Sequence, residues 1–362
     1  MRITFALPFL TMTGGIRVVF EHTRQLERLG HVVQLVVPAI RPGLPFTARG
    51  RAKLRSYLHD RLVDRPERTL AWYGLSDRAQ VVDELRADKF PDADVLIATS
   101  WPTAGLVADA PARCGKKAYF LQHYEVFEPG QDAAVDATWR LPLERIVIAG
   151  WLARLARERF GVATWGPVIN GVNLDQFRPE DRLENDPPVV GMMYELQPWK
   201  GVADGFEAIR LARESLPGLR VHLFGRYRLR HALRAGDRYE RNPSQERIAQ
   251  IYRSCDLFLS PSWSEGCQLP PMEAMASGCA VVATRVGGIP DYGIEGRTVL
   301  VAEPRDPAAL AAHLVRLRED RVAREALAAA GLERIREFPW ESASAALERC
   351  LVAIAAGERA PS

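Results

Sequence analysis

The chain alternates short apolar runs with segments of helical periodicity. Most apolar runs are followed by a loop and by a segment that favours a helix. Strands are predicted at 3–7, 31–37, 94–99, 117–121, 145–149 and 168–173 in the first half, and at 188–194, 219–224, 256–260, 279–284 and 297–301 in the second. Strands that alternate with helices form parallel sheets. The pattern therefore predicts an α/β protein with two doubly wound, Rossmann-like parallel sheets.

Residues 174–188 interrupt this alternation. The segment is acidic, contains prolines and has almost no periodic apolar positions, so we interpret it as an interdomain linker. The predicted organisation is an N-terminal Rossmann-like domain at 1–173 and a C-terminal Rossmann-like domain at 189–338. A terminal amphipathic helix follows within 339–362.

Basic residues gather in one part of the first half. Residues 49–68 hold seven Lys and Arg against three acids. We interpret this segment as a solvated basic insertion, with contact to an anionic acceptor or to an anionic membrane as the alternatives. The net charge of +3 is mild and the arginine clusters lack interleaved aromatic residues, so nucleic acid is not an expected partner.

Composition is that of a soluble globular protein, with 47% hydrophobic and 26% charged residues. The chain has no apolar run of signal-peptide or membrane-span length, so we expect a cytoplasmic protein, with peripheral contact at the inner face of the membrane as an alternative. The five cysteines are scattered without zinc-ligand spacing, and we expect neither disulfides nor a bound metal. Richness in arginine and alanine suggests a bacterial, GC-rich genome.

The stretch from 256 to 290 carries the most chemistry. An apolar strand ends at Pro261, a loop contains Glu265, and a helix is predicted from about Pro271 to Gly278. The free N–H groups and the positive dipole end of that helix form an anion site. Glu265 and Glu273 bracket the anion site, and carboxylates accept hydrogen bonds from sugar hydroxyls. A nucleotide sugar offers both an anion and hydroxyls.

Residues 265–273 read Glu-Gly-Cys-Gln-Leu-Pro-Pro-Met-Glu. This segment resembles the Glu-x7-Glu motif of retaining glycosyltransferases of family 4, the glycogen-synthase-like group. The resemblance covers nearly the whole chain and includes Gly14-Gly15, Asn170-Gly-Val-Asn173, Lys200-Gly201, Gly287-Gly288 and Phe338-Pro-Trp-Glu341. It implies the GT-B architecture of two facing Rossmann-like domains, with the last helix crossing back to the first domain. It also implies metal-independent hexosyl transfer with retention, from a nucleoside diphosphate sugar to an acceptor hydroxyl.

The resemblance assigns roles to individual residues. Lys200 is the phosphate-binding lysine, Glu265 orients the sugar hydroxyls and Glu273 holds the nucleotide ribose. His123 lies on the loop after the strand at 117–121 and contacts the transferred sugar. Gly14 and Gly15, at a helix entrance, let the donor phosphates approach the backbone.

Two positions depart from the family pattern. The family usually has an arginine directly after the glycine of the first C-domain strand, where this chain has Met192, and Arg226 after the next strand is a candidate replacement. Gln268 stands where the family commonly has glycine, so its side chain narrows the donor site or contacts the sugar. The backbone N–H groups of Cys267, Gln268 and Leu269 are further candidate donor contacts.

Three other functions compete with this interpretation. The first is a phosphorylase or sugar-phosphate synthase, which has the same fold. The second is a non-catalytic nucleotide-sugar-binding subunit, which does not need the family arginine that is absent at Met192. A dinucleotide dehydrogenase is disfavoured, because the strand at 31–37 runs into Pro38 without the acidic residue that holds the ribose. The nucleotide sugar is a substrate, and no cofactor is expected. The acceptor class covers saccharides, lipid-linked sugars and small molecules, as in cell-surface polysaccharide, glycolipid or natural-product glycosylation.

Overall fold

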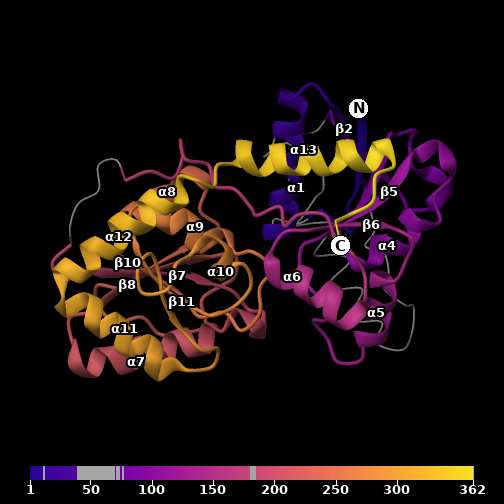
Figure 1. Ribbon diagram of the computed structural model, residues 1–362. Coiled ribbons are helices and arrows are strands. Elements are labelled where there is room, and N and C mark those ends of the chain that lie inside the picture. The colour runs from indigo at the N-terminus through magenta and orange to yellow at the C-terminus, as the bar shows by residue number, and fades with distance from the viewer. Residues whose placement is uncertain (11–12, 39–69, 71–73, 76, 180–184, 362) are drawn as a thin grey trace. The chain divides into compact units, whose positions relative to one another are not determined.

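The computed structural model describes residues 1–10, 13–38, 70, 74–75, 77–179 and 185–361. The chain forms two compact units (Figure 1): unit 1 consists of Met1–Val168 and Ala343–Ser362, and unit 2 consists of Ile169–Ser342. The predicted basic insertion at 49–68 lies outside the described residues. In the part of the chain that is described, no helix is both long and apolar enough to cross a membrane.

Unit 1 is built on a parallel six-stranded sheet of order β3-β2-β1-β4-β5-β6. Its strands are β1 (Arg2–Ala6), β2 (Val32–Pro38), β3 (Ala79–Val82), β4 (Val95–Ala98), β5 (Lys116–Leu121) and β6 (Glu144–Val147). Its helices include α1 (Gly14–Arg28), α4 (Trp101–Ala108), α5 (Asp132–Trp139) and α6 (Gly150–Leu155), with a π-helical turn at Ala156–Phe160 and 3-10 turns at Ala87–Lys89 and Ala112–Cys114.

Unit 2 is built on a second parallel six-stranded sheet, of order β12-β11-β10-β7-β8-β9. Its strands are β7 (Val189–Tyr194), β8 (Arg220–Gly225), β9 (Arg238–Arg241), β10 (Leu257–Ser260), β11 (Ala280–Thr284) and β12 (Leu300–Ala302). Its helices are η4 (Pro198–Lys200, a 3-10 turn), α7 (Val202–Ser215), α8 (Gln245–Arg253), α9 (Leu269–Ala276), α10 (Ile289–Tyr292), α11 (Pro307–Glu319) and α12 (Arg321–Ile335).

The two sheets have the same connectivity. Counted from the first strand of each unit, both orders read 3-2-1-4-5-6, which is the Rossmann order. In this order the chain reverses direction across the sheet between the first and fourth strands, so the switch point lies between β1 and β4 in unit 1 and between β7 and β10 in unit 2. The predicted α/β fold with two doubly wound parallel sheets is confirmed.

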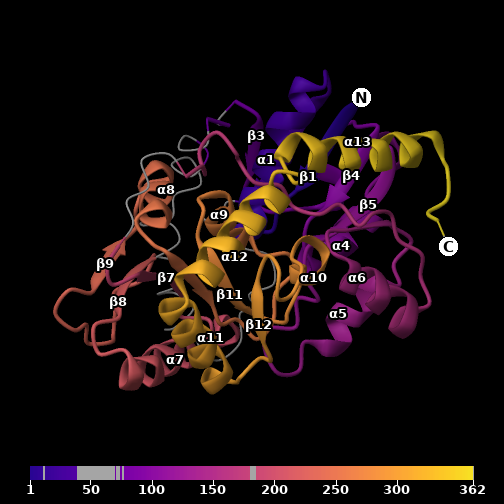
Figure 2. The same ribbon diagram turned by 60° about the vertical axis from the view of Figure 1, so that its left-hand side comes forward.

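Helices cover both faces of the unit 2 sheet. Helices α7 and α11 lie on one face, and α8 and α9 lie on the other (Figures 1 and 2). The central strands are therefore apolar on both sides, as parallel strands buried between helices must be. Val190 and Met192 of β7, Leu257 and Leu259 of β10 and Leu310 of α11 belong to one buried cluster.

Three details differ from the sequence-based expectation. Strands β3 and β9 were missed because they are edge strands with half-exposed, largely polar residues and no apolar run. The predicted strand at 168–173 is wrong, since only an isolated bridge between Val172 and Pro339 forms there. A Cβ at Gly171 would lie 2.5 Å from the Cα of Trp340, so this segment packs against another piece of backbone instead of extending a sheet.

The last helix, α13 (Trp340–Ala356), begins in unit 2 and continues into unit 1 from Ala343. Within unit 1 it is hydrogen-bonded to the first β-α-β segment. The Oγ atom of Ser344 lies 2.8 Å from Nδ1 of His22 in α1, and Glu348 Oε1 lies 2.8 Å from Nε2 of His31. These contacts join residues more than 300 positions apart, so the final helix is part of the unit 1 structure.

Candidate functional site

The switch point of the unit 2 sheet collects polar side chains on three loops. Glu195 follows β7, Arg226 follows β8, and Ser262 and Glu265 follow β10. In open α/β sheets ligands bind outside the carboxyl ends of the strands at such a switch point. The loops after β7, β8 and β10 are therefore the place to look for a ligand site.

Lys200 and Glu265 form an ion pair among the loops that follow β7, β8 and β10. Lys200 Nζ lies 2.8 and 3.0 Å from the two carboxylate oxygens of Glu265, and Ser262 Oγ donates to Oε1 at 2.8 Å. The two side chains are 25% and 14% exposed, so the pair is partly shielded yet open to an incoming ligand. The structure thus brings together two of the predicted site residues that are 65 positions apart.

Gly201 fixes the geometry of this ion pair. Its φ of +62° suits glycine, and a Cβ there would lie 1.9 Å from the carbonyl oxygen of Pro261. The loop after β7 is therefore pressed directly against the loop after β10. Two hydrogen bonds from Trp263 add to this contact: its backbone N–H donates to Trp199 O at 2.6 Å, and its Nε1 donates to Asp204 of α7 at 2.6 Å.

Helix α9 begins at Leu269, two residues earlier than predicted. Pro270 and Pro271 then occupy the second and third helical positions, and proline has no N–H group. Two of the four free N–H groups of an ordinary helix start are thus missing, which leaves those of Gln268 and Leu269. The predicted anion site at this helix end has fewer backbone donors than expected.

The Gln268 side chain lies at the start of α9. It is only 4% exposed, and Ser260 Oγ donates to its Oε1 at 3.0 Å. Its Nε2 atom is buried and finds no hydrogen-bond acceptor among the described residues. Gln268 lines a small cavity of about 20 Å³ together with Lys200 and Glu265. The Gln268 side chain thus lies at the same cavity as the ion pair.

Glu273 and Cys267 of the 265–273 segment are buried. Glu273 is 3% exposed, one turn into α9, and accepts a hydrogen bond from Tyr252 Oη at 3.0 Å. Cys267 O accepts a hydrogen bond of 2.9 Å from Nδ2 of the buried Asn170. Burial raises the pKa of the Cys267 thiol to about 12, so this thiol stays neutral.

Glu195 is a charged residue of this site that sequence reasoning missed. Burial raises the pKa of its carboxyl group, while the positive charges of Lys200 and Arg226 act in the opposite direction. Met192, by contrast, is fully buried in β7 beside Gly205 of α7, so an arginine at that position would lie in the core. The position after the strand end, where the chain has Glu195, is the one that faces the two cations.

The remaining predicted site residues belong to unit 1. Gly14 begins α1, and a Cβ there would meet nothing within 4 Å; a Cβ at Gly15 would contact the Gln122 side chain at 3.4 Å. His123 follows β5 and packs against two aromatic rings, with centroid distances of 5.1 Å to Phe127 and 5.8 Å to Trp151. Gly14 is thus an open position at a helix start, and His123 lies in an aromatic setting.

Glu125, two residues beyond His123, has a structural partner. Its Oε2 accepts hydrogen bonds from the backbone N–H of Trp101, at 2.5 Å, and from Tyr119 Oη, at 3.2 Å. It therefore satisfies a free N–H group in the first turn of α4. Burial raises the pKa of Glu125 to about 7, against the weaker effect of those two hydrogen bonds.

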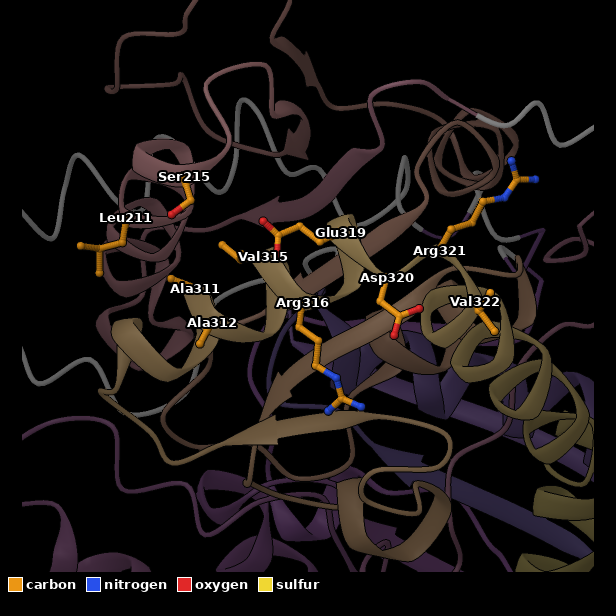
Figure 3. A pocket seen from close by; sticks show the side chains of 10 residues that line it. All are labelled: Leu211, Ser215, Ala311, Ala312, Val315, Arg316, Glu319, Asp320, Arg321 and Val322. Atoms are coloured by element: carbon orange, nitrogen blue, oxygen red, sulfur yellow. The ribbon is translucent and has the colours of Figure 1, made fainter.

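A separate hollow of about 860 Å³ lies on unit 2 between α7, α11 and the start of α12 (Figure 3). None of the predicted site residues lines it. Its polar side chains do not converge, since Arg316 and Arg321 point in different directions in Figure 3. A ligand site combines an apolar pocket with a few convergent polar groups, so this hollow lacks an essential feature. No group of three His, Cys, Asp or Glu side chains within the described ranges is arranged to hold a metal ion.

The class of fold is shown by solved structures that match almost the whole chain. A sucrose-phosphate synthase from Thermosynechococcus elongatus matches with a TM-score of 0.74 at 19% identity, covering 99% of this chain and 100% of that one. HepE from Anabaena, solved in complex with UDP and glucose, matches with a TM-score of 0.72 at 16% identity, covering 98% of this chain and 100% of that one. The fold is that of the GT-B glycosyltransferases.

The matches by sequence cover less of the chain than these matches by structure do. Residues 187–320, which lie within unit 2, match the family model of glycosyl transferases group 1. A D-inositol 3-phosphate glycosyltransferase of Corynebacterium diphtheriae is 36% identical over 103 residues, which is 28% of this chain and 24% of that protein. In eight curated relatives, the matched regions span from 24% to 48% of the relatives' own length. The predicted glycosyltransferase resemblance is confirmed at this level.

Proposed function

We propose that the protein is a retaining glycosyltransferase of family 4 that moves a hexosyl group from a nucleoside diphosphate sugar to an acceptor hydroxyl without a metal ion. The observation that carries the proposal is the arrangement of Lys200, Glu265 and Gln268 around one cavity at the switch point of the unit 2 sheet. These side chains offer a cation for a phosphate, a carboxylate for sugar hydroxyls and an amide donor without a protein acceptor among the described residues.

Lys200 supplies the positive charge for the leaving diphosphate. The sequence supports this role, because Lys200 is the only lysine among residues 118–362 of a chain that otherwise uses arginine. A lysine ammonium is a compact point charge on a flexible stem, and it can exchange one anion for another by a small rotation. When a diphosphate arrives, Lys200 Nζ turns from Glu265 to the phosphate oxygens and Glu265 becomes available to the hydroxyls of the donor sugar.

Two further residues position the donor in this proposal. The Gln268 amide, held through its oxygen by Ser260, donates to a donor oxygen in the cavity. Glu273, held by Tyr252, accepts from the ribose hydroxyls. Arg226 adds positive charge near the phosphates, and His123 contacts the transferred sugar. Gly14, Gly15 and the backbone N–H groups of the 267–269 segment complete the donor contacts.

The chemical step needs no protein nucleophile. The acceptor oxygen forms a bond to the anomeric carbon on the face that the diphosphate leaves, the bond from that carbon to the phosphate oxygen breaks, and the acceptor proton passes to the leaving phosphate. The preorganised charge of Lys200 stabilises the negative charge that develops on the diphosphate. The products are the glycosylated acceptor and a nucleoside diphosphate. Cell-surface polysaccharide, glycolipid and natural-product glycosylation all use acceptors of this kind.

The test combines nucleotide binding with donor turnover. Thermal unfolding is measured with UDP, GDP, ADP, TDP and CDP, since a ligand that binds only the folded state raises its stability. Release of the same nucleotide from its hexose conjugates is then followed. For Lys200→Met, which keeps the stem and removes the charge, we expect the thermal shift to vanish and kcat/KM to fall by on the order of a hundredfold. Lys200→Arg retains part of the activity, because it keeps the charge in another geometry.

Arg210→Met is the matched control. Arg210 is a half-exposed cation on α7 that pairs with Glu207 and Glu214, away from the cavity, and its loss should change neither readout. Full turnover by Lys200→Met would contradict the proposal. Stabilisation by inorganic phosphate or sugar phosphates but by no nucleotide would favour a phosphorylase or sugar-phosphate synthase, and nucleotide binding without turnover would favour a non-catalytic subunit.

A further inference from the structure

The carboxyl end of β7 places an acidic side chain beside the proposed phosphate site. In the parallel pairing of β7 with β8, the last residue of β7, Tyr194, lies opposite the last residue of β8, Gly225. The residues that follow them, Glu195 and Arg226, therefore leave the sheet at the same level. On its other side β7 pairs with β10, whose following loop carries Glu265. Glu195 therefore lies on the loop after β7, which also carries Lys200, with the Arg226 loop on one side and the Glu265 loop on the other.

The charges around Glu195 are balanced before any ligand arrives. Lys200 and Arg226 attract its carboxylate, and Glu265 repels it. Tyr239, from the edge strand β9, also interacts electrostatically with Glu195. Lys200 is already paired with Glu265, so the four charged groups sum to zero when both carboxyl groups are ionised. A diphosphate that enters this site adds at least two negative charges to a neutral cluster.

Ionised Glu195 then opposes the diphosphate. A carboxylate near a phosphate repels it, and partial burial strengthens that repulsion relative to water. A carboxyl group that takes up a proton removes the repulsion and gains an O–H donor for a phosphate oxygen. The partial burial of Glu195 raises its pKa, so a proton costs less there than on an exposed glutamate.

We propose that Glu195 sets the affinity of this site for the donor diphosphate and takes up a proton when the diphosphate binds. The inference rests on the proposed function, because the ligand is the nucleoside diphosphate part of the donor. Binding of the nucleotide should weaken as the pH rises, since protonated Glu195 is the form that tolerates the ligand. The second ionisation of the free diphosphate acts on binding as well, and it is the same for every variant.

Glu195→Gln is the isosteric test, because glutamine imitates the protonated carboxyl group. Isothermal titration at pH 8 should give about tenfold tighter binding of the nucleoside diphosphate by Glu195→Gln than by the unsubstituted protein, which corresponds to one unit of pKa coupling. The difference should shrink towards pH 5.5. Titration at several pH values from 5.5 to 8, in two buffers of different ionisation enthalpy, counts protons. At the pH of greatest uptake the unsubstituted protein should take up more protons per nucleotide than Glu195→Gln does.

Glu207→Gln is the control, because Glu207 is an exposed carboxylate on α7 that pairs with Arg210. It should leave both affinity and proton uptake unchanged. Equal affinity and equal proton uptake in the unsubstituted protein and in Glu195→Gln would overturn the inference while nucleotide binding, lost in Lys200→Met, still supports the proposed function. Weaker binding by Glu195→Gln at every pH would also overturn it. If the unsubstituted protein and Glu195→Gln bind no nucleotide at all, both the proposed function and the inference fail.

Discussion

The two units share a strand order but treat their buried ionisable side chains differently. In unit 1, burial favours the neutral form of two such groups: it raises the pKa of Glu125 to about 7 and lowers the pKa of His22 to about 3. In unit 2, Lys200 pairs with Glu265 at 2.8 Å and Arg213 pairs with Asp237 at 2.5 Å. The Lys200–Glu265 pair of unit 2 is partly exposed, so its charges can be exchanged for those of a ligand.

The comparison shows that topology places a site without choosing its chemistry. Both sheets have a switch point, where ligands of such folds bind. In unit 1, Thr99 directly after β4 donates to Ala6 O of β1 at 2.8 Å, and Glu125 after β5 accepts from the first turn of α4. In unit 2 the corresponding loops hold a cation, two carboxylates and an amide whose N–H groups lack a partner among the described residues. Function resides in such side chains and not in the fold that carries them.

The largest expected effect comes from Gly201, the residue that precedes α7 in unit 2. Gly201→Ala forces a Cβ to within 1.9 Å of Pro261 O at a φ of +62°, so the loops after β7 and β10 must separate. We expect a loss of about 3 kcal/mol or more in the free energy of unfolding, combining backbone strain with the clash. Urea unfolding followed by circular dichroism measures it.

Gly14→Ala is the matched substitution in unit 1. Gly14 begins α1 as Gly201 precedes α7, but a Cβ at Gly14 meets nothing within 4 Å. We expect no loss of stability, since alanine favours the helix over glycine. Similar destabilisation by the two substitutions would show that the switch-point loops of the two units are equally constrained, which contradicts the comparison.

The sequence was sufficient for the fold and for most individual residues of the candidate site. Apolar runs located ten of the strands, and the order of strands and helices predicted parallel sheets. The polar edge strands β3 and β9 carry no such signal. The binding roles of Lys200, Glu265 and Gln268 stay predictions, although each was singled out from its local motif.

Interactions between distant residues were beyond the sequence. The Lys200–Glu265 ion pair depends on the contact of Gly201 with Pro261, which joins two loops about 60 positions apart. The sequence did not indicate Glu195, because a glutamate after a strand usually points to solvent. Only the pairing register of β7 and β8, which ends both strands at the same level, brings it beside Arg226. Burial of Glu125 follows from tertiary packing in the same way.

An intermediate effect is expected from the neutral acid of unit 1. In the folded protein the pKa of Glu125 is raised to about 7 from a reference value of 4.5, so the stability it contributes is present below pH 4.5 and is lost as the pH rises through 7. Glu125→Gln keeps an oxygen for Trp101 N–H and Tyr119 Oη and cannot ionise. At pH 8 we expect this variant to be more stable by about 2 kcal/mol, and at pH 4.5 by almost nothing.

Unfolding by urea at several pH values measures the difference between the two proteins. His22 titrates in the opposite direction, since its lowered pKa makes the folded protein lose stability as the pH falls below 6.5. That effect is common to both proteins and cancels in the difference. A variant that is less stable at pH 8 would mean that Glu125 is ionised in the fold and stabilises the α4 dipole as a charge, which would make unit 1 resemble unit 2.

The smallest expected effect concerns a paired charge within unit 1. Glu348 of α13 lies 2.8 Å from His31 Nε2, with the glutamate side chain 27% exposed. Glu348→Gln keeps a hydrogen-bonding side chain and removes the charge, so we expect a loss of less than about 1 kcal/mol, as for other partly exposed ion pairs.

Ser344→Ala removes instead the hydroxyl that lies 2.8 Å from the buried Nδ1 of His22. It should cost more, on the order of 1–3 kcal/mol, because a buried ring nitrogen loses its partner. Urea unfolding measures both losses. If Glu348→Gln lost more stability than Ser344→Ala, the pairing of Glu348 with His31, and not the buried contact of Ser344 with His22, would hold α13 to unit 1.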